Sequence, residues 1–255
     1  MADSDPAPLA DQIVLITGAG RGLGRATAVK LAGLGALVGA LDIDAGSCLQ
    51  TAELIRRAGG RALAFGVDVS DRSAFAHAAA ELAAEHGRLD AVINNAMLLR
   101  YEPIERVTED VLDRMLAVGI KAAVWGAQLL IAHLAAERGG ALINLASPVA
   151  ERGYPNTCIY SLVKGAMVTL TKTLAAELGP RRIRVNAVAP GSVPTPGAVG
   201  LNDPAEYERR ARTIPLRRLG REEDHANAVA FLLSPAASFI NGEILHVDGG
   251  IAAAG

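Results

Sequence analysis

The chain has 255 residues, a length that one large domain can reach, and 51% of them are hydrophobic while only 4% are aromatic. A formal net charge of −2 gives no electrostatic reason to expect a nucleic acid or an anionic membrane as partner. The acidic start, the two cysteines without Cys-x-x-Cys spacing and the absence of an uncharged apolar stretch of about 18 residues argue against a secretory signal, a disulfide framework and a transmembrane helix. We therefore expect a cytoplasmic globular protein.

Short apolar segments alternate with helical patterns along the chain. Strands are expected at 12–16, 36–41, 61–67, 89–93, 141–145, 182–188 and 243–247, and helices at 25–34, 44–58, 71–86, 109–137, 156–179, 204–213 and 222–233. Buried strands that alternate with helices indicate βαβ units. The sequence predicts one doubly wound, Rossmann-type α/β domain over residues 1–255, with a parallel seven-stranded sheet, helices on both faces and a flexible N-terminus at 1–10.

The turn after the first predicted strand is rich in glycine. It reads Thr17-Gly18-Ala19-Gly20-Arg21-Gly22-Leu23-Gly24, so its spacing is Thr-Gly-x-x-x-Gly-x-Gly and differs from Gly-x-Gly-x-x-Gly. Glycines allow a tight turn and a close approach of the backbone to a diphosphate, and a helix N-terminus offers free N–H groups with partial positive charge. A glycine-rich loop without a ligand is the competing interpretation, and the place of the turn in a βαβ unit favours the dinucleotide site.

Asp42 ends the second predicted strand, where a carboxylate can accept hydrogen bonds from the ribose of adenosine. With Ile43 beside it, this carboxylate favours NAD because it would repel the 2′-phosphate of NADP. Arg21 points the other way, since it could reach a 2′-phosphate. Asp68 and Val69 follow the third strand and could bracket the adenine, although a helix-capping role for Asp68 is an equal alternative.

Tyr160 and Lys164 are four residues apart, so they stack on one face of the predicted helix 156–179. The ammonium of Lys164 is expected to lower the pKa of Tyr160 from its ordinary value of about 10, which would make the phenol a general acid and base. Ser147 is a candidate to hold the substrate oxygen. A Tyr-x-x-x-Lys pair alone is typical of an ordinary helix surface, and the glycine turn with Asp42 favours the catalytic interpretation.

In their order and spacing these features resemble the short-chain dehydrogenase/reductase family over nearly the whole chain. The matching motifs are the glycine turn, Asp68-Val69, Asn94-Asn95-Ala96, Ser147, Tyr160-x-x-x-Lys164, Asn186 with Pro190-Gly191, and Val247-Asp248-Gly249-Gly250. The resemblance implies that Tyr160 exchanges the proton with the substrate oxygen, that Lys164 lowers its pKa and holds the nicotinamide ribose, and that Ser147 positions the substrate. It also implies cofactor contacts from Asn95, Ala96, Pro190, Gly191, Val193 and Thr195.

Two positions depart from the family pattern. Met97 follows Asn94-Asn95-Ala96 where the family has glycine, and Gly119 stands where it has a catalytic asparagine. In the family that asparagine accompanies a helix kink and a water relay that reaches the lysine. Because Gly119 keeps its main-chain carbonyl and tolerates a distorted helix, we expect the relay to be damaged or rerouted while the enzyme remains.

Residues 192–216 are rich in proline and glycine and follow a strand's carboxyl end, which predicts a substrate-binding lid. Its charged residues, Glu206, Arg209 and Arg210 among them, are expected to face solvent. The expected substrate pocket is apolar or aromatic and indicates a hydrophobic alcohol or ketone, with Arg100 and Arg152 left open as ligands of an anionic group; the pocket residues are Met97, Pro148, Val149 and Tyr154.

The predicted function is hydride transfer between NAD(H) and a secondary alcohol or ketone. The same chemistry with NADP(H) is one alternative, and a nucleotide-binding protein with weak or no turnover, because of Gly119, is another. No two of the five histidines have the spacing of metal ligands, so no metal site is expected. The resemblance further implies a homotetramer in which helices 109–137 and 156–179 pair between subunits.

Overall fold

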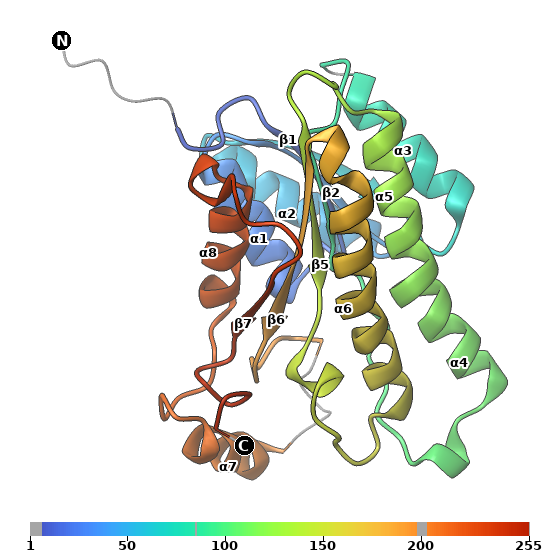
Figure 1. The fold of residues 1–255 in the computed structure, drawn as a ribbon, viewed down its shortest axis with the longest axis vertical. Coiled ribbons are helices and arrows are strands. Elements are labelled where there is room, and N and C mark those ends of the chain that lie inside the picture. The colour runs from blue at the N-terminus through green and yellow to red at the C-terminus, as the bar shows by residue number, and fades with distance from the viewer. Residues whose placement is uncertain (1–6, 85, 198–202, 255) are drawn as a thin grey trace.

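The computed structural model describes residues 7–84, 86–197 and 203–254 (Figure 1). Within them the strands form a seven-stranded sheet in the order β3-β2-β1-β4-β5-β6-β7, and every neighbouring pair is parallel. The strands are β1 (Ile13–Thr17), β2 (Leu37–Asp42), β3 (Arg61–Gly66), β4 (Ala91–Asn94), β5 (Gly140–Leu145), β6 (Ile183–Pro190) and β7 (Ile244–Val247). The predicted α/β class and parallel sheet are confirmed.

Helices cover both faces of the sheet (Figure 1). One core lies between the sheet and α1, α2 and α8, and a second lies between the sheet and α3, α5 and α6. The helices are α1 (Gly22–Gly33), α2 (Ala45–Arg57), α3 (Arg72–Ala84), α4 (Glu109–Leu116), α5 (Ala122–Ala132), α6 (Cys158–Leu178), α7 (Pro204–Thr213) and α8 (Glu222–Leu233). Strands such as β1, whose five residues are all buried, explain why the sequence shows continuous apolar runs.

The predicted long helix at 109–137 is present but ends earlier and is not uniform. α4 and α5 are joined by a π-helical segment, Ala117–Lys121, which contains Gly119. Short π segments inside α-helices are where such helices change direction, and glycine tolerates the distortion. The structure thus keeps an irregular helix at this position even though the family's asparagine is replaced.

The continuous helix Glu109–Ala132 is, within the described part of the chain, the one that is long and apolar enough to cross a membrane by length and composition. The mean hydropathy of its most apolar window is 1.7, and 39% of that window is buried inside the subunit. From the sequence we expected no transmembrane helix, because charged residues such as Lys121 interrupt the apolar run. A core helix of a soluble protein meets the same criteria, so this finding is weak evidence for a membrane span.

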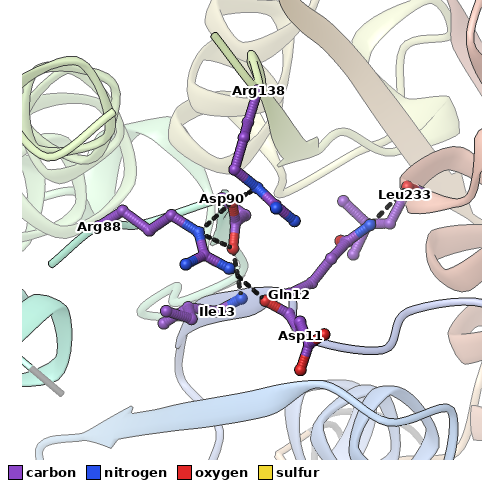
Figure 2. Close-up of polar contacts among 7 residues, drawn as sticks. All are labelled: Asp11, Gln12, Ile13, Arg88, Asp90, Arg138 and Leu233. Carbon is purple, nitrogen blue, oxygen red and sulfur yellow. Dashed lines mark hydrogen bonds and ion pairs between the residues drawn. The ribbon is translucent and has the colours of Figure 1, made fainter. Parts of the chain in front are cut away.

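The amino ends of β1 and β4 are tied together by a buried carboxylate (Figure 2). Asp90 accepts a hydrogen bond from the backbone N–H of Ile13 at 2.9 Å and pairs with Arg88 at 3.0 Å and with Arg138 at 3.5 Å. Arg88 also donates to the carbonyl of Asp11 at 2.7 Å. This cluster fixes the strand starts, so that the carboxyl ends of the strands lie side by side at the opposite edge of the sheet.

Residues 7–10 differ from the flexible N-terminus expected at 1–10. Leu9 is fully buried in the core beside α1 and α8, and its N–H donates to the carbonyl of Leu34 at 3.0 Å. Residues 1–6 of the predicted flexible segment lie outside the described residues. The isolated Leu9 carries no periodic pattern, and therefore local sequence gave no sign of its burial.

Candidate active site

The carboxyl ends of the central strands open into one cavity of about 1430 Å³. Its walls come from the glycine turn, the segments after β4, β5 and β6, and α7. The predicted site residues that line it are Gly18, Arg21, Gly22, Leu23, Gly24, Asp42, Ile43, Asp68, Val69, Asn95, Ala96, Met97, Ser147, Pro148, Val149, Tyr154, Tyr160, Lys164, Pro190, Gly191, Val193 and Thr195. Thr17 and Gly20 do not line it and support the wall from behind.

The glycine turn allows a ligand to approach its backbone closely. Gly18 and Gly22 have positive φ angles of 66° and 57°, and a Cβ at Gly24 would collide with the carbonyl oxygen of Gly18. Among the described residues no side chain caps α1, whose N-terminus begins in this turn at Gly22. Its first N–H groups can therefore bind an anion such as a diphosphate.

Thr17 and Asn95 join the glycine turn to the segment after β4. The Thr17 hydroxyl accepts hydrogen bonds from the N–H groups of Asn95 and Ala96, both at 3.0 Å. The Asn95 amide donates to the carbonyls of Thr17 at 2.8 Å and Gly18 at 3.0 Å. The side chain of Asn95 thus holds the turn in shape.

The Asp42 carboxylate is fixed at the carboxyl end of β2. It accepts from the N–H of Gly20 at 2.9 Å and from the N–H of Asp44 at 3.1 Å. Held in this way, it faces the place where a cofactor ribose would lie, and it would repel a phosphate there. Hydrogen bonds from Ser47 are the main cause of the lowered pKa of Asp44, and the charge of Arg21 adds a smaller effect.

Asp68 does not cap α3. That role belongs to Asp71, which accepts from the N–H groups of Ser73 and Ala74 at 2.9 and 3.0 Å. Asp68 instead pairs with Arg114 of α4 at 2.6 Å and accepts from Ser70. Arg114 also lines the cavity, although no sequence motif had pointed to it.

Ser147, Tyr160 and Lys164 meet beside the end of β5. The Ser147 hydroxyl lies close enough to the Tyr160 hydroxyl to favour ionisation of the phenol, and Lys164 Nζ lies 5.6 Å from the centre of the Tyr160 ring. Lys164 donates to the carbonyl of Leu145 at 2.7 Å. The ring of Tyr101 packs edge-on against Tyr160 with centroids 5.4 Å apart, a contact that sequence reasoning missed because Tyr101 lies in an irregular segment.

The electrostatics differ from the expectation that Lys164 lowers the pKa of Tyr160. Burial raises the pKa of Tyr160 above its ordinary value, Tyr101 adds to the increase, and the nearby Ser147 hydroxyl acts against it. Burial also lowers the pKa of Lys164 to about 8. Desolvation is therefore the largest influence on the pKa of both groups.

Comparison with known proteins decides the family. Residues 18–252 match the family model described as Enoyl-(Acyl carrier protein) reductase. The 4-formylbenzenesulfonate dehydrogenase of Comamonas testosteroni is 40% identical over 94% of this chain and 97% of its own length. The chain belongs to the short-chain dehydrogenase/reductase family. It is accordingly an NAD(P)-dependent oxidoreductase that acts on alcohols or ketones.

Solved structures of short-chain dehydrogenase/reductases agree with this fold. A 7α-hydroxysteroid dehydrogenase complexed with NADH superposes with a TM-score of 0.92 at 32% identity, covering 98% of both chains. A protein assigned as an NAD(P)-dependent gluconate 5-dehydrogenase from Beutenbergia cavernae, with bound NADP, gives a TM-score of 0.91 at 35% identity, covering 98% of this chain and 100% of that one. The family thus includes users of both cofactors.

Met97 and Gly119, the two residues that differ from the short-chain dehydrogenase/reductase pattern, lie next to each other in the structure. A Cβ built on Gly119 would collide with Val163 and would lie 3.1 Å from the sulfur of Met97. Met97 and Gly119 also line a cavity of about 10 Å³ together with Lys164. The methionine therefore borders the space into which a side chain at position 119 would extend, and the two substitutions fit each other.

Proposed function

We propose that this enzyme transfers a hydride between NAD(H) and a secondary alcohol or ketone of a hydrophobic small molecule. The observation that carries the proposal is that one cavity contains Ser147, Tyr160 and Lys164 together with the glycine turn and the Asp42 carboxylate. When bound, the dinucleotide supplies the hydride donor or acceptor. The glycine turn would hold its diphosphate, Asp42 its adenosine ribose, and Lys164 its nicotinamide ribose.

In this proposal the chain's own residues handle the proton and the substrate oxygen. Tyr160 donates its hydroxyl proton to a carbonyl oxygen, or accepts one from an alcohol, and Ser147 positions that oxygen through its own hydroxyl. Lys164, held by Leu145, keeps positive charge near the phenol when Tyr160 is ionised. Met97, the segment that begins at Pro148 and Val149, and Ile214 exclude water from the substrate side.

The preference for NAD rests on Asp42. We expect a higher kcat/KM with NAD than with NADP, because the fixed carboxylate would oppose a 2′-phosphate. Asp42→Ala should bring the kcat/KM values with NAD and NADP closer together. The test follows the NADH absorbance with both cofactors and a panel of cyclic, aromatic and aliphatic alcohols and ketones. A wild-type preference for NADP would refute the assignment.

A second candidate function, nucleotide binding with weak or no turnover, is favoured by Gly119 alone. NADH binding and turnover distinguish the two candidates. If NADH binds but no compound of the panel reacts, and Tyr160→Phe alters neither binding nor turnover, the second candidate holds. Turnover that Tyr160→Phe abolishes supports hydride transfer.

A further inference from the structure

The cavity has charged residues at both of its ends. At the substrate end its wall includes three residues of α7 that we expected to face solvent, Glu206, Arg209 and Arg210. At the cofactor end the wall contains Asp68, from the segment after β3, and Arg114 of α4. The proposed mechanism gives Arg114 no role.

The order of the strands indicates which part of a dinucleotide would lie beside Asp68. The glycine turn follows β1, Asp42 ends β2 and Asp68 follows β3, and these strands are neighbours in the sheet. Asp42 is level with Gly66 in the register of β2 and β3. Because neighbouring strands lie about 4.8 Å apart, the three positions follow one another along the carboxyl edge of the sheet. With the diphosphate at the glycine turn and the ribose at Asp42, the base lies at Asp68.

Apolar side chains form part of the wall at this base position. Ile43, Val67 and Val69 line the cavity there. A flat heteroaromatic ring fits between apolar sides, while its polar edge needs hydrogen-bonding groups. Asp68 and Arg114 supply such groups, with side chains that are 30% and 40% exposed.

Asp68, Ser70 and Arg114 form a closed set of hydrogen bonds. Arg114 donates from Nη2 to Asp68 Oδ2 and from Nη1 to the Ser70 hydroxyl, both at 2.6 Å. Asp68 Oδ1 accepts from the Ser70 hydroxyl at 2.7 Å and from the Ser70 N–H at 2.9 Å. A guanidinium can only donate and a hydroxyl has one proton, so Ser70 accepts from Arg114 and gives its proton to Asp68.

This arrangement keeps Asp68 an acceptor. Burial opposes ionisation of Asp68, but the hydrogen bonds from Ser70 and Arg114 outweigh it and hold the pKa of the carboxyl below its ordinary value. An ionised carboxylate has no proton to donate. Among the described residues its Oδ2 accepts one hydrogen bond, from Arg114, so a lone pair of this oxygen remains for a ligand.

We propose that Arg114 is a positioning residue that holds Asp68 as a fixed hydrogen-bond acceptor, so that the cofactor site selects a 6-aminopurine over a 6-oxopurine. The inference rests on the proposed dinucleotide site and specifies which base that site takes. A 6-amino group donates to the carboxylate, whereas a 6-oxo group would place a second acceptor against it.

The test measures binding and needs no turnover. Calorimetric titration compares NADH with reduced nicotinamide hypoxanthine dinucleotide, which carries a 6-oxopurine in place of adenine. We expect the wild-type protein to bind NADH roughly 10- to 100-fold more tightly. Asp68→Asn should bring the two affinities close together, because an amide can also donate.

Arg114→Met should lower the ratio of the two affinities by at least about fivefold, because the carboxylate loses the donor that fixes Oδ2. Arg114→Lys keeps the charge but lacks the planar fork that reaches both Ser70 and Asp68, so it should lower the ratio as well. Arg72→Met is the matched control and should keep the wild-type ratio. Arg72 is an exposed arginine of α3 that donates to Gln128 at 3.0 Å and is not part of the described cavity wall.

The ratio is decisive because a general loosening of the fold would weaken both ligands alike, and melting curves show that the variants are folded. Three results would overturn the inference and leave the proposed function in place: a wild-type ratio of one or below, a ratio that both Arg114 variants preserve, or a folded Arg114 variant that binds neither ligand. If the wild-type protein binds neither dinucleotide, the proposed function fails together with the inference.

Discussion

At the scale of single residues, Gly119 and Val163 restrict each other. A methyl group at position 119 would collide with a Val163 Cγ, and the β-branched valine has little freedom to turn away inside α6. We expect Gly119→Ala to destabilise the protein by about 1–3 kcal/mol through overpacking, although alanine is the better helix former by about 1 kcal/mol. Urea unfolding measures the change.

Val163→Ala, added to the Gly119→Ala variant, should recover part of the lost stability. A double-mutant cycle gives the coupling free energy between the two positions. Gly119→Asn should lower turnover, because the larger side chain must also displace Met97, whose sulfur lies 3.1 Å from the built Cβ. A sharp rise in turnover would show instead that the water relay is damaged when glycine stands where the family has asparagine.

His225 is a buried histidine that the proposed mechanism does not use. It is 1% exposed, and within the described part of the chain neither ring nitrogen has a hydrogen-bond partner. Burial, with a smaller effect of Lys164, lowers its pKa to about 4. The unfolded chain, with the ordinary value of about 6.5, therefore binds an extra proton between these two pH values, and stability falls as pH falls from 6.5 to 4.

His225→Leu should stabilise the protein and remove about 3 kcal/mol of this pH dependence, by the usual relation of about 1.4 kcal/mol per pKa unit. Denaturant unfolding at pH 4.5 and 7.5 measures it. His77→Gln, at an exposed position of α3, is the matched control and should change neither value. An unaltered pH dependence in the leucine variant would contradict the assignment.

At the scale of elements, the Asp90 cluster aligns strands that lie far apart in sequence. We expect Asp90→Asn to cost about 1–3 kcal/mol, because the neutral amide cannot compensate the Arg88 charge and the N–H of Ile13 loses a charged acceptor. KM for the cofactor should stay near the wild-type value, since the cluster lies at the amino ends of β1 and β4, whereas the cavity lies at the carboxyl ends of the strands. Thermal unfolding and cofactor titration test the two statements.

In the helix Glu109–Ala132, some features follow from the local sequence and others depend on tertiary packing. Its existence and starting point follow from the apolar periodicity and from Thr108, which caps α4. Its π-helical segment depends on packing against α6 and on the space around Met97, so no local pattern predicts it.

At the scale of the whole molecule, we propose that the enzyme is a cytoplasmic homotetramer. The most apolar window of the helix Glu109–Ala132 is only 39% buried, and Leu162 on the adjacent α6 is 54% exposed. Light scattering at micromolar concentration should give the mass of four chains. A mass of one chain would disprove the proposal, and Leu162→Glu should shift the mass downward if α6 takes part.

The α/β class, the parallel sheet and most of the residues that meet in the cavity could be predicted from the sequence, because each depends on local periodicity, glycine spacing and motif order. The order of the strands, the orientation of the α7 charges, the place of Tyr101 on Tyr160 and the direction in which the pKa of Tyr160 moves could be seen only in the folded structure. These depend on which side chains meet across the fold and on how much water they lose there. The Tyr160–Lys164 pair was visible in the sequence, but its desolvation was not.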